Sequence, residues 1–292
     1  MSSRDYTLGQ ALLTIENINV SYDHPVLVNV NANIKDIKCT HIDPSTGKPF
    51  VKGQVVALLG PSGYGKTQLF RTIAGLNKPN SGIVYINNCN CGREGCTKER
   101  CAVHAGDVGV VAQSYPLFPH RTVMGNLMLA AKRNGKTTAQ AHDEIMAYLT
   151  EFELADKVND YPASLSGGQR QRIAIIQQVL CNNHFILMDE PFSGLDPIAL
   201  EKAAQLIQKI ANLDELNTII IVTHDVTAGC AVADTVWMLG HDKNPDGTNI
   251  PGTHIVKSYN LIDLDLAWHP DITLTPNFMA FVAQLKREFR EL

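Results

Sequence analysis

The chain has 292 residues, of which 45% are hydrophobic and 18% are charged, and its formal net charge is -4. This is the composition of an ordinary soluble globular protein, with one domain and an appendage or with two domains. A slightly acidic chain without a basic run argues against a nucleic-acid partner, so we expect no nucleic acid to bind. No apolar stretch approaches the roughly 18–20 residues of a membrane helix, and the N-terminus lacks the apolar core of a secretory signal, so we expect a cytoplasmic protein.

The first third of the chain contains predicted strands and one predicted helix. Alternating apolar and polar residues predict strands over residues 12–20 and 26–34. Turn-forming residues at 43–49 predict a hairpin within residues 36–52. Residues 54–59 are a short apolar run that fits a buried strand, and residues 67–74 have apolar residues at helical spacing.

The remainder of the chain alternates between predicted strands and helices. Residues 123–158 and 168–180 have helical patterns, and short apolar runs predict strands at residues 109–112, 185–188, 218–222 and 235–239. This alternation predicts an α/β fold with a mainly parallel sheet that is covered on both faces. After residue 240, a loop and an extended segment precede an amphipathic helix from residue 277, which we interpret as a tail packed on the core.

A glycine-rich loop separates the strand at 54–59 from the helix that follows. It reads Gly60-Pro61-Ser62-Gly63-Tyr64-Gly65-Lys66-Thr67, with Gln68 next. Glycines let the backbone turn sharply and approach phosphate oxygens, which the N–H groups of the loop and helix start can bind. Lys66 is expected to bridge the β- and γ-phosphates, and the Thr67 hydroxyl to ligate Mg²⁺. The loop predicts a nucleoside triphosphate site, and we assign Gly60 to Gln68 to it.

Two adjacent carboxylates end the apolar run at 185–188. Side chains alternate along a strand, so Asp189 and Glu190 are expected to point in different directions. We expect Asp189 to hold Mg²⁺ through its water shell, and Glu190 to act as the general base that polarises the attacking water. The alternative is an acidic pair with a structural role only.

A third segment, Leu165-Ser166-Gly167-Gly168-Gln169, lies about a hundred residues after the glycine loop. The three segments, in this order, resemble the ATP-binding-cassette (ABC) ATPases over residues 12–239. The resemblance implies a P-loop NTPase fold with a mainly parallel sheet core, an antiparallel β subdomain and an inserted helical subdomain at about residues 115–172. It also implies a cassette domain at residues 1–240. Residues 241–292 lie outside the resemblance, and we interpret them as a C-terminal extension packed on the core.

The resemblance assigns roles to three further residues. Gln113 matches the loop whose amide reaches Mg²⁺ and the attacking water, and His224 matches the histidine that contacts the γ-phosphate. Tyr22 resembles the aromatic that stacks on adenine. His224 and Tyr22 have plainer alternatives, because a single histidine is usually packed or solvated and an aromatic in a strand is usually part of the core.

The resemblance also implies that two copies of the chain form one machine. Ser166, Gly167, Gly168 and Gln169 open a predicted helix, and a hydroxyl with glycine N–H groups at a helix start forms an anion site. In the family this site binds the γ-phosphate held by the opposite subunit. Asp196 lies in the segment through which the two subunits communicate. We therefore expect a homodimer that holds two ATP molecules between its subunits.

Two functions follow from the resemblance, and the first is favoured. The first is an ATP-hydrolysing subunit that lies on the inner face of the cell membrane, bound to polytopic permease subunits, with an external solute-binding protein as a further partner. Residues 117–120 and 126–130 resemble importers of small polar solutes such as amino acids, whereas the tail resembles the nitrate and sulfonate group. The second function is a cassette ATPase without a transporter, serving an assembly process such as iron–sulfur cluster biogenesis.

The cysteines are unevenly distributed. There are seven, an odd number, in a chain without an export signal, which argues against a disulfide scaffold. Four of them cluster with a histidine, namely Cys89, Cys91, Cys96, Cys101 and His104. Thiolates and an imidazole at such distances can hold a structural Zn²⁺ ion. The spacing does not match a pair of CxxC motifs, and reduced thiols on a surface loop are the alternative.

Overall fold

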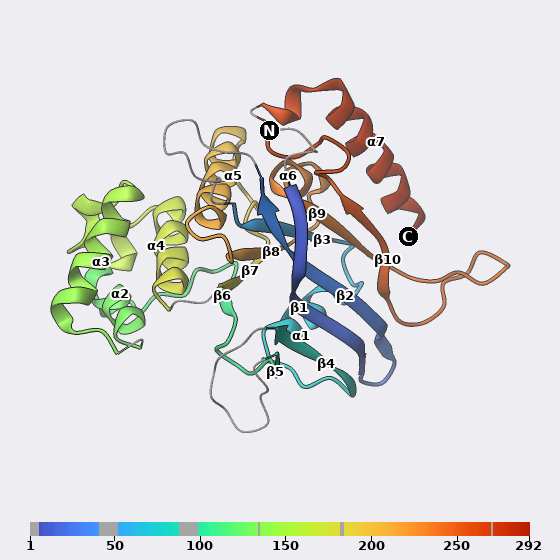
Figure 1. Cartoon of the computed structure of the whole chain (residues 1–292), viewed down its shortest axis with the longest axis horizontal. Coiled ribbons are helices and arrows are strands. Elements are labelled where there is room, and N and C mark those ends of the chain that lie inside the picture. Colours follow the sequence, from blue (N-terminus) through green and yellow to red (C-terminus); the bar gives the residue numbers. More distant parts are fainter. Residues whose placement is uncertain (1–5, 41–51, 88–98, 134, 182–183, 270) are drawn as a thin grey trace.

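The computed structural model describes residues 6–40, 52–87, 99–133, 135–181, 184–269 and 271–292. A six-stranded sheet forms the centre of the molecule, with the strand order β10-β9-β3-β8-β7-β6 (Figure 1). All neighbours in it are parallel except β10, which is antiparallel to β9. Its strands are β3 (Gln54–Leu59), β6 (Gly109–Val111), β7 (Phe185–Asp189), β8 (Thr218–Thr223), β9 (Thr235–Gly240) and β10 (His254–Asn260).

A second, four-stranded antiparallel sheet has the order β2-β1-β4-β5. Its strands are β1 (Tyr6–Ser21), β2 (Pro25–Cys39), β4 (Ser81–Asn87) and β5 (Arg100–Ala102). The outer ends of β1 and β2 extend beyond the alternating residues that predicted them. These ends are held by cross-strand pairing with register shifts, and Asn17 and Asn29 adopt positive φ angles at the irregularities. Part of the hairpin predicted within residues 36–52 lies outside the described residues.

Helices cover both faces of the six-stranded sheet, as expected for a parallel sheet. Every residue of β3 and β8 is buried, with alternate side chains packed into different apolar clusters. The helices around the sheet are α1 (Lys66–Ile73), α5 (Pro197–Ala211), α6 (Val226–Val232) and α7 (Pro276–Glu291). α1 lies in the cluster shared with the four-stranded sheet, whereas α5 packs in the cluster on the other face. These features confirm the predicted α/β fold with an antiparallel sheet.

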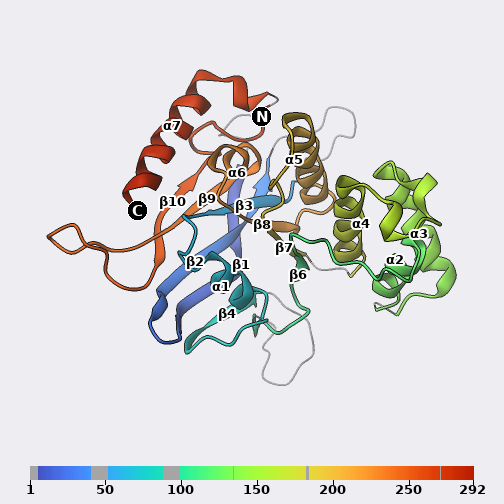
Figure 2. The same ribbon diagram turned by 180° about the vertical axis from the view of Figure 1, so that it is seen from behind.

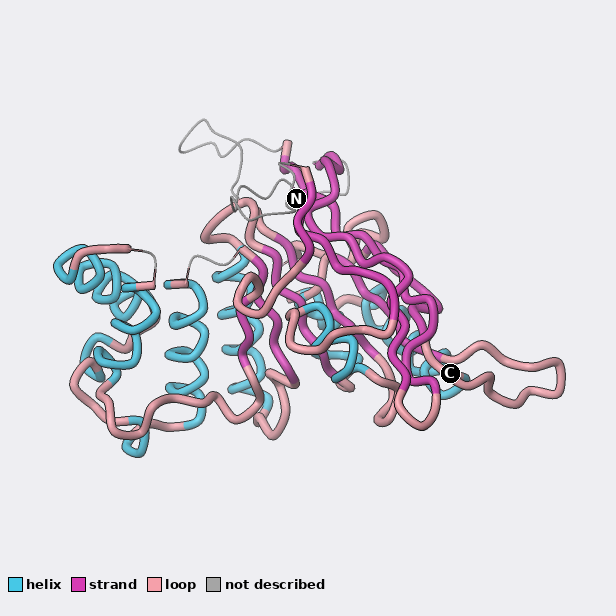
Figure 3. The backbone as a smooth tube through the Cα atoms, turned by 90° about the horizontal axis from the view of Figure 1, so that it is seen from below, coloured by secondary structure: helices cyan, strands magenta, loops and turns pink. Residues whose placement is uncertain are grey.

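Three helices form a group beside the sheets, which is clear when the chain is seen from below (Figure 3). They are α2 (Val123–Lys132), α3 (Thr138–Glu151) and α4 (Gly167–Leu180), with short 3-10 turns at Ala155–Lys157 and Pro162–Ser164. Each helix has an N-cap hydroxyl, from Thr122, Thr137 and Ser166 respectively. Such caps stabilise a helix start by about 1 kcal/mol. In the chain, these three helices follow β6 and precede β7, so the group is an insertion between two neighbouring strands of the sheet.

The residues after β9 pack at one edge of the six-stranded sheet. They form an exposed hairpin between β9 and β10, then a 3-10 turn at Ile272–Leu274 and the amphipathic helix α7. Phe278, Phe281, Val282 and Leu285 of α7 are buried in a cluster that includes residues of α6 and β9. No described helix has both the length and the apolar character needed to cross a membrane.

Candidate functional site

Most of the predicted site residues follow the carboxyl ends of four adjacent parallel strands, β3, β8, β7 and β6. The glycine loop follows β3, His224 follows β8, and Glu190 follows β7. Gln113 lies exposed in the turn after β6. Because parallel strands end at the same edge of a sheet, this edge gathers the loops, as in other open α/β sheets that bind ligands there.

The glycine loop has the backbone geometry that its composition predicts. Gly63 and Gly65 have φ angles of 88° and 80°, which favour glycine. A Cβ atom on Gly65 would lie 2.9 Å from Val26 Cγ1, so the loop packs tightly against β2. Lys66 Nζ donates hydrogen bonds to the carbonyl oxygens of Gly60 at 2.6 Å and Pro61 at 2.9 Å. The Lys66 side chain thus folds back onto the first residues of the glycine loop.

Glu190 is held in one orientation by three hydrogen bonds. Its Oε2 accepts from Thr223 Oγ1 at 2.9 Å, and its Oε1 accepts from the His224 backbone N–H at 3.1 Å. The same Oε1 lies 2.7 Å from His224 Nδ1, so this ring nitrogen carries a hydrogen when Glu190 is ionised. The Glu190 side chain is 18% exposed and the His224 side chain 59%. This arrangement can position a base at the open edge of the sheet.

Thr223 contacts Glu190, and its sequence pattern did not predict this role. It ends β8 beside His224, and its hydroxyl fixes the second oxygen of Glu190. A threonine at the end of a buried strand is a weak signal by itself, since β-branched residues are common in strands. The pairing of β7 with β8, which places Asp189 opposite Val222, is what brings the two residues together.

Asp189 lies in an unfavourable electrostatic environment. Burial raises the pKa of its carboxyl group, and the neighbouring Glu190 charge raises it further, although Lys66 and Arg71 act in the opposite direction. Burial also lowers the pKa of the Lys66 ammonium, although the Glu190 and Asp189 charges act in the opposite direction. Two carboxylates that share a half-buried edge form an oxygen-rich, negative site of the kind that a divalent cation neutralises. Thr67 is exposed in the first turn of α1 and can add a hydroxyl oxygen.

The charge on Asp189 is expected to destabilise the nucleotide-free protein. Its pKa is higher in the folded state than in the unfolded chain, so the folded state binds more protons between the two values and stability falls as pH rises through that interval. Asp189→Asn should therefore raise the melting temperature at neutral pH in EDTA, and the gain should vanish below about pH 4. Differential scanning fluorimetry over a pH series measures this. Asp143→Asn, whose side chain is 85% exposed, is the control and should change little; a lower melting temperature for Asp189→Asn at neutral pH would contradict the expectation.

Tyr22 is an exposed aromatic beside the glycine loop. It follows β1, the residue is 62% exposed, and its Oη donates to Gln68 Oε1 in α1 at 2.9 Å. This bond connects Tyr22 to the helix that begins in the loop. The exposed ring can stack on a flat ligand whose other end lies in the loop.

The segment 165–169 lies apart from the glycine loop of its own chain. Ser166 caps α4, and its Oγ accepts from the Gln169 backbone N–H at 3.2 Å while Gln169 Oε1 accepts from the Ser166 N–H at 2.8 Å. A Cβ atom on Gly167 or Gly168 would meet nothing within 4 Å, so this turn is open. α4 lies with α2 and α3, on the far side of β6 and β7 from α1 (Figures 1 and 2).

Asp196 has a local structural role. It caps α5, with its Oδ1 accepting from the backbone N–H groups of Ile198 at 3.0 Å and Ala199 at 2.9 Å. The structure thus brings together the loop residues, Tyr22, Asp189, Glu190 and His224. It does not bring the 165–169 turn to them within one chain.

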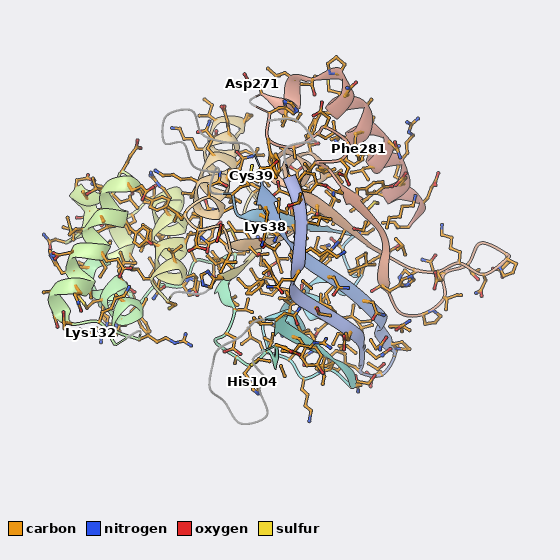
Figure 4. All side chains as sticks on the ribbon, viewed as in Figure 1. Lys38, Cys39, His104, Lys132, Asp271 and Phe281 are labelled. Atoms are coloured by element: carbon orange, nitrogen blue, oxygen red, sulfur yellow. The ribbon has the colours of Figure 1, made fainter. Side chains whose placement is uncertain are left out.

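The described residues give no support to the zinc hypothesis. Cys89, Cys91 and Cys96 lie outside the described residues. Cys101 is buried and disulfide-bonded, so it is neither the free thiol nor the zinc thiolate that was expected. His104 lies at the opposite end of the molecule from α7 (Figure 4), and its Nδ1 is 2.8 Å from the Ala102 carbonyl oxygen. No group of three or more His, Cys, Asp and Glu residues in the described part of the chain could hold a metal ion.

Comparison with known proteins places these motifs in one family. The family description "ABC transporter" matches residues 49–193. The probable ABC transporter ATP-binding protein PEB1C of Campylobacter jejuni is 33% identical over 227 residues, which are 77% of this chain and 85% of that protein. The arginine transport ATP-binding protein ArtM of Bacillus subtilis is 33% identical over 243 residues, which are 80% of this chain and 92% of that protein.

A solved structure agrees with the sequence relatives. The dimeric structure of MJ0796, a bacterial ABC transporter cassette, has a TM-score of 0.61 and 26% identity, covering 85% of this chain and 98% of that one. The identity and coverage of the sequence relatives are sufficient to assign the family. The chain therefore belongs to the ABC transporter family and is one of its ATPases.

Proposed function

We propose that the protein is the ATP-hydrolysing subunit of a membrane transporter that imports a small polar solute, with an amino acid as the favoured class. The relative ArtM, named for arginine transport, supports this class. The main support for ATP hydrolysis is the arrangement of side chains at the carboxyl edge of the sheet. Glu190 is fixed there by Thr223 and His224. The glycine loop ends at the same edge, and Lys66 is hydrogen-bonded to the loop backbone.

ATP binding is assigned to the loop and to Tyr22. The N–H groups of the loop and the start of α1 would bind the phosphates, and Lys66 would move from the Gly60 and Pro61 carbonyl oxygens to the β- and γ-phosphates. Tyr22 would stack on adenine, held to α1 by its bond to Gln68. The assigned loop residues are Gly60, Pro61, Ser62, Gly63, Tyr64, Gly65, Lys66, Thr67 and Gln68.

The donor set fits Mg²⁺, the ion that the family implies. Thr67 and Asp189 offer the oxygen ligands that Mg²⁺ prefers, and Gln113 is the third proposed ligand. When bound, the ion neutralises charge on the β- and γ-phosphates. The raised pKa of Asp189 supports a cation partner, because a positive ion would relieve the repulsion from Glu190.

Hydrolysis is assigned to Glu190, His224 and Gln113. The Glu190 carboxylate would accept a proton from the attacking water, and the hydrogen bond from Thr223 would keep its second oxygen in place. His224 is largely exposed and could leave Oε1 of Glu190 to contact the γ-phosphate. Gln113, exposed after β6, would orient the water.

A second copy of the chain completes each site in this proposal. The open turn of Ser166, Gly167, Gly168 and Gln169 at the start of α4 would bind an anion, and it lies apart from the glycine loop of its own chain. Two copies in a head-to-tail arrangement would each cap the partner's γ-phosphate, with Asp196 near the contact. The dimeric structure of the MJ0796 cassette supports the formation of a dimer. We keep residues 1–240 as the cassette, with its helical part at about 115–172, and residues 241–292 as the extension.

The proposed membrane partners are polytopic permease subunits, which would hold the protein on the inner face of the membrane. An external solute-binding protein is a further proposed partner. The alternative of an assembly ATPase, such as one for iron–sulfur clusters, is not favoured, because ArtM is a transport protein by its name.

Affinity capture tests this function. A tagged copy of the chain, expressed in its native host, should retain a polytopic membrane protein when membranes are solubilised in detergent and the partners are identified by mass spectrometry. The untagged chain is the control for unspecific retention. Recovery with only partners that lack membrane spans would overturn the transporter proposal and favour an assembly role.

A further inference from the structure

The segment between β9 and β10 returns to the glycine loop. It forms a hairpin that projects beyond the sheets (Figures 1 and 3), and its last residue before β10, Thr253, is only 2% exposed. Gly252 has a φ angle of 92°, and a Cβ atom there would lie 2.2 Å from Val28 Cγ2. The segment before β10 can therefore approach β2 closely, and this places Thr253 in contact with the glycine loop.

Thr253 forms hydrogen bonds with both β2 and the glycine loop. Its backbone N–H donates to the Val26 carbonyl oxygen at 3.0 Å, and its Oγ1 lies 2.8 Å from the Tyr64 carbonyl oxygen and 3.0 Å from that of Val26. A hydroxyl has one proton, and the Val26 oxygen already accepts from the N–H. The proton is therefore assigned to the Tyr64 oxygen, which has no other donor within the described residues.

The Tyr64 carbonyl matters because it belongs to the same peptide unit as the Gly65 N–H. A trans peptide is planar, and its C=O and N–H point in opposite directions. With the carbonyl held by Thr253, the Gly65 N–H is directed away from the extension, and it has no acceptor in the described part of the chain. Gly65 has a φ angle of 80° and caps α1, so its conformation also sets the start of that helix.

A second contact holds the side chain of Tyr64. The rings of Tyr64 and His241 meet edge to face, with centroids 4.7 Å apart. His241 Nδ1 lies 3.0 Å from the Ile250 carbonyl oxygen and 2.9 Å from that of Gly252, so this nitrogen carries a hydrogen and connects the two arms of the hairpin. Tyr64 is thus held at its carbonyl and at its ring by the same segment.

We propose that Thr253 and His241 are positioning residues for the glycine loop, which fix the Tyr64–Gly65 peptide so that the Gly65 N–H is available to a phosphate group. The hairpin and the nucleotide would then be thermodynamically coupled. This inference rests on the proposed function, because it assigns phosphate binding to the loop.

The test measures nucleotide affinity in full-length variants with a fluorescent ATP analogue and by ADP competition. Thr253→Val keeps the shape but removes the hydroxyl, and should weaken ATP and ADP binding by about tenfold. Thr253→Ser keeps the hydroxyl and should restore affinity. Thr248→Val is the matched control, since among the described residues the Thr248 hydroxyl bonds only within the hairpin, to Asp246 and Asn244, and affinity should not change.

His241→Ala provides a second variant in case the buried substitution fails to fold. It should weaken binding of both nucleotides by about threefold through the lost ring contact. The melting temperature without nucleotide is measured in parallel, because a merely structural role would lower it and leave the dissociation constants unchanged. That pattern in Thr253→Val, or wild-type affinity in both Thr253→Val and His241→Ala, would overturn the inference.

Binding by the wild type and by Lys66→Ala separates a wrong positioning role from a wrong phosphate site. If the wild type binds ATP in a Lys66-dependent manner and the Thr253 and His241 variants bind equally well, only the positioning role is wrong. If the wild type does not bind ATP, or binds it independently of Lys66, the phosphate site itself is wrong and the inference falls with it.

Discussion

Replacing Glu190 by glutamine is expected to slow ATP hydrolysis by about 10²- to 10⁴-fold while leaving ATP binding intact. Glutamine has the same shape and retains an oxygen that can accept from Thr223 or the His224 N–H, so the fold of the β7 end should persist. It cannot take a proton from water. ATP should therefore remain bound, and the dimer that closes around it should accumulate.

Two measurements check this expectation. Phosphate release gives the rate, and size-exclusion chromatography with and without ATP gives the dimer population. Glu215→Gln is the matched control, because Glu215 is an exposed residue between α5 and β8, and both measurements should match the wild type. Hydrolysis at the wild-type rate by Glu190→Gln would show that the base has been assigned to the wrong residue.

The local patterns of the chain predict the centre of the fold well. The apolar run at residues 54–59 becomes β3 with the predicted bounds, and the run at 185–188 becomes β7 with one further residue, Asp189. These strands are buried on both faces, and a continuous apolar run needs no information from distant residues to be recognised. The glycine loop is similarly local, because its positive φ angles at Gly63 and Gly65 follow from residue type.

The contacts that orient the site are not local and could not be predicted. Glu190 adopts a φ angle of 48°, which is unusual for a residue with a side chain, and its oxygens are fixed by residues 33 and 34 positions later in the chain. The bond from Thr253 to Tyr64 spans 189 positions. Such pairs depend on the sheet order, and the sequence of a single chain contains no pattern that reports it.

The contacts that attach the C-terminal extension to the sheet are also long-range and could not be predicted from local patterns. Asp234 is 2% exposed, and its Oδ2 accepts from the Val55 backbone N–H at 2.7 Å while its Oδ1 accepts from Trp268 Nε1. A buried carboxylate requires such donors, because an unpaired charge in the interior is costly. The periodicity of α7 predicts that a helix forms there, but it does not indicate that Trp268 reaches the start of the strand that leads into the glycine loop.

Replacing Lys66 by alanine is expected to weaken ATP binding by about 10- to 100-fold, which corresponds to the loss of a charge-assisted hydrogen bond. Titration with a fluorescent ATP analogue measures the effect. Lys78→Ala is the matched control, since Lys78 is an exposed lysine after α1, and its affinity should equal that of the wild type. We expect a loss of affinity rather than a gain because ATP is negatively charged. Without Lys66, the loop retains only its backbone N–H groups and the partial positive charge at the start of α1.

Lys66 also bonds to its own loop, so the loss has two sources that must be separated. Without the lysine, the Gly60 and Pro61 carbonyl oxygens lose a donor, and the loop itself could change conformation. A lost phosphate contact should weaken ATP and ADP binding but leave the affinity for adenosine unchanged, because adenosine has no phosphate and would contact only the proposed stacking residue, Tyr22. A collapsed loop would weaken adenosine as well, because Tyr22 is bonded to Gln68 in the helix that the loop begins. Equal affinity of Lys66→Ala and wild type for ATP would rule out the phosphate role altogether.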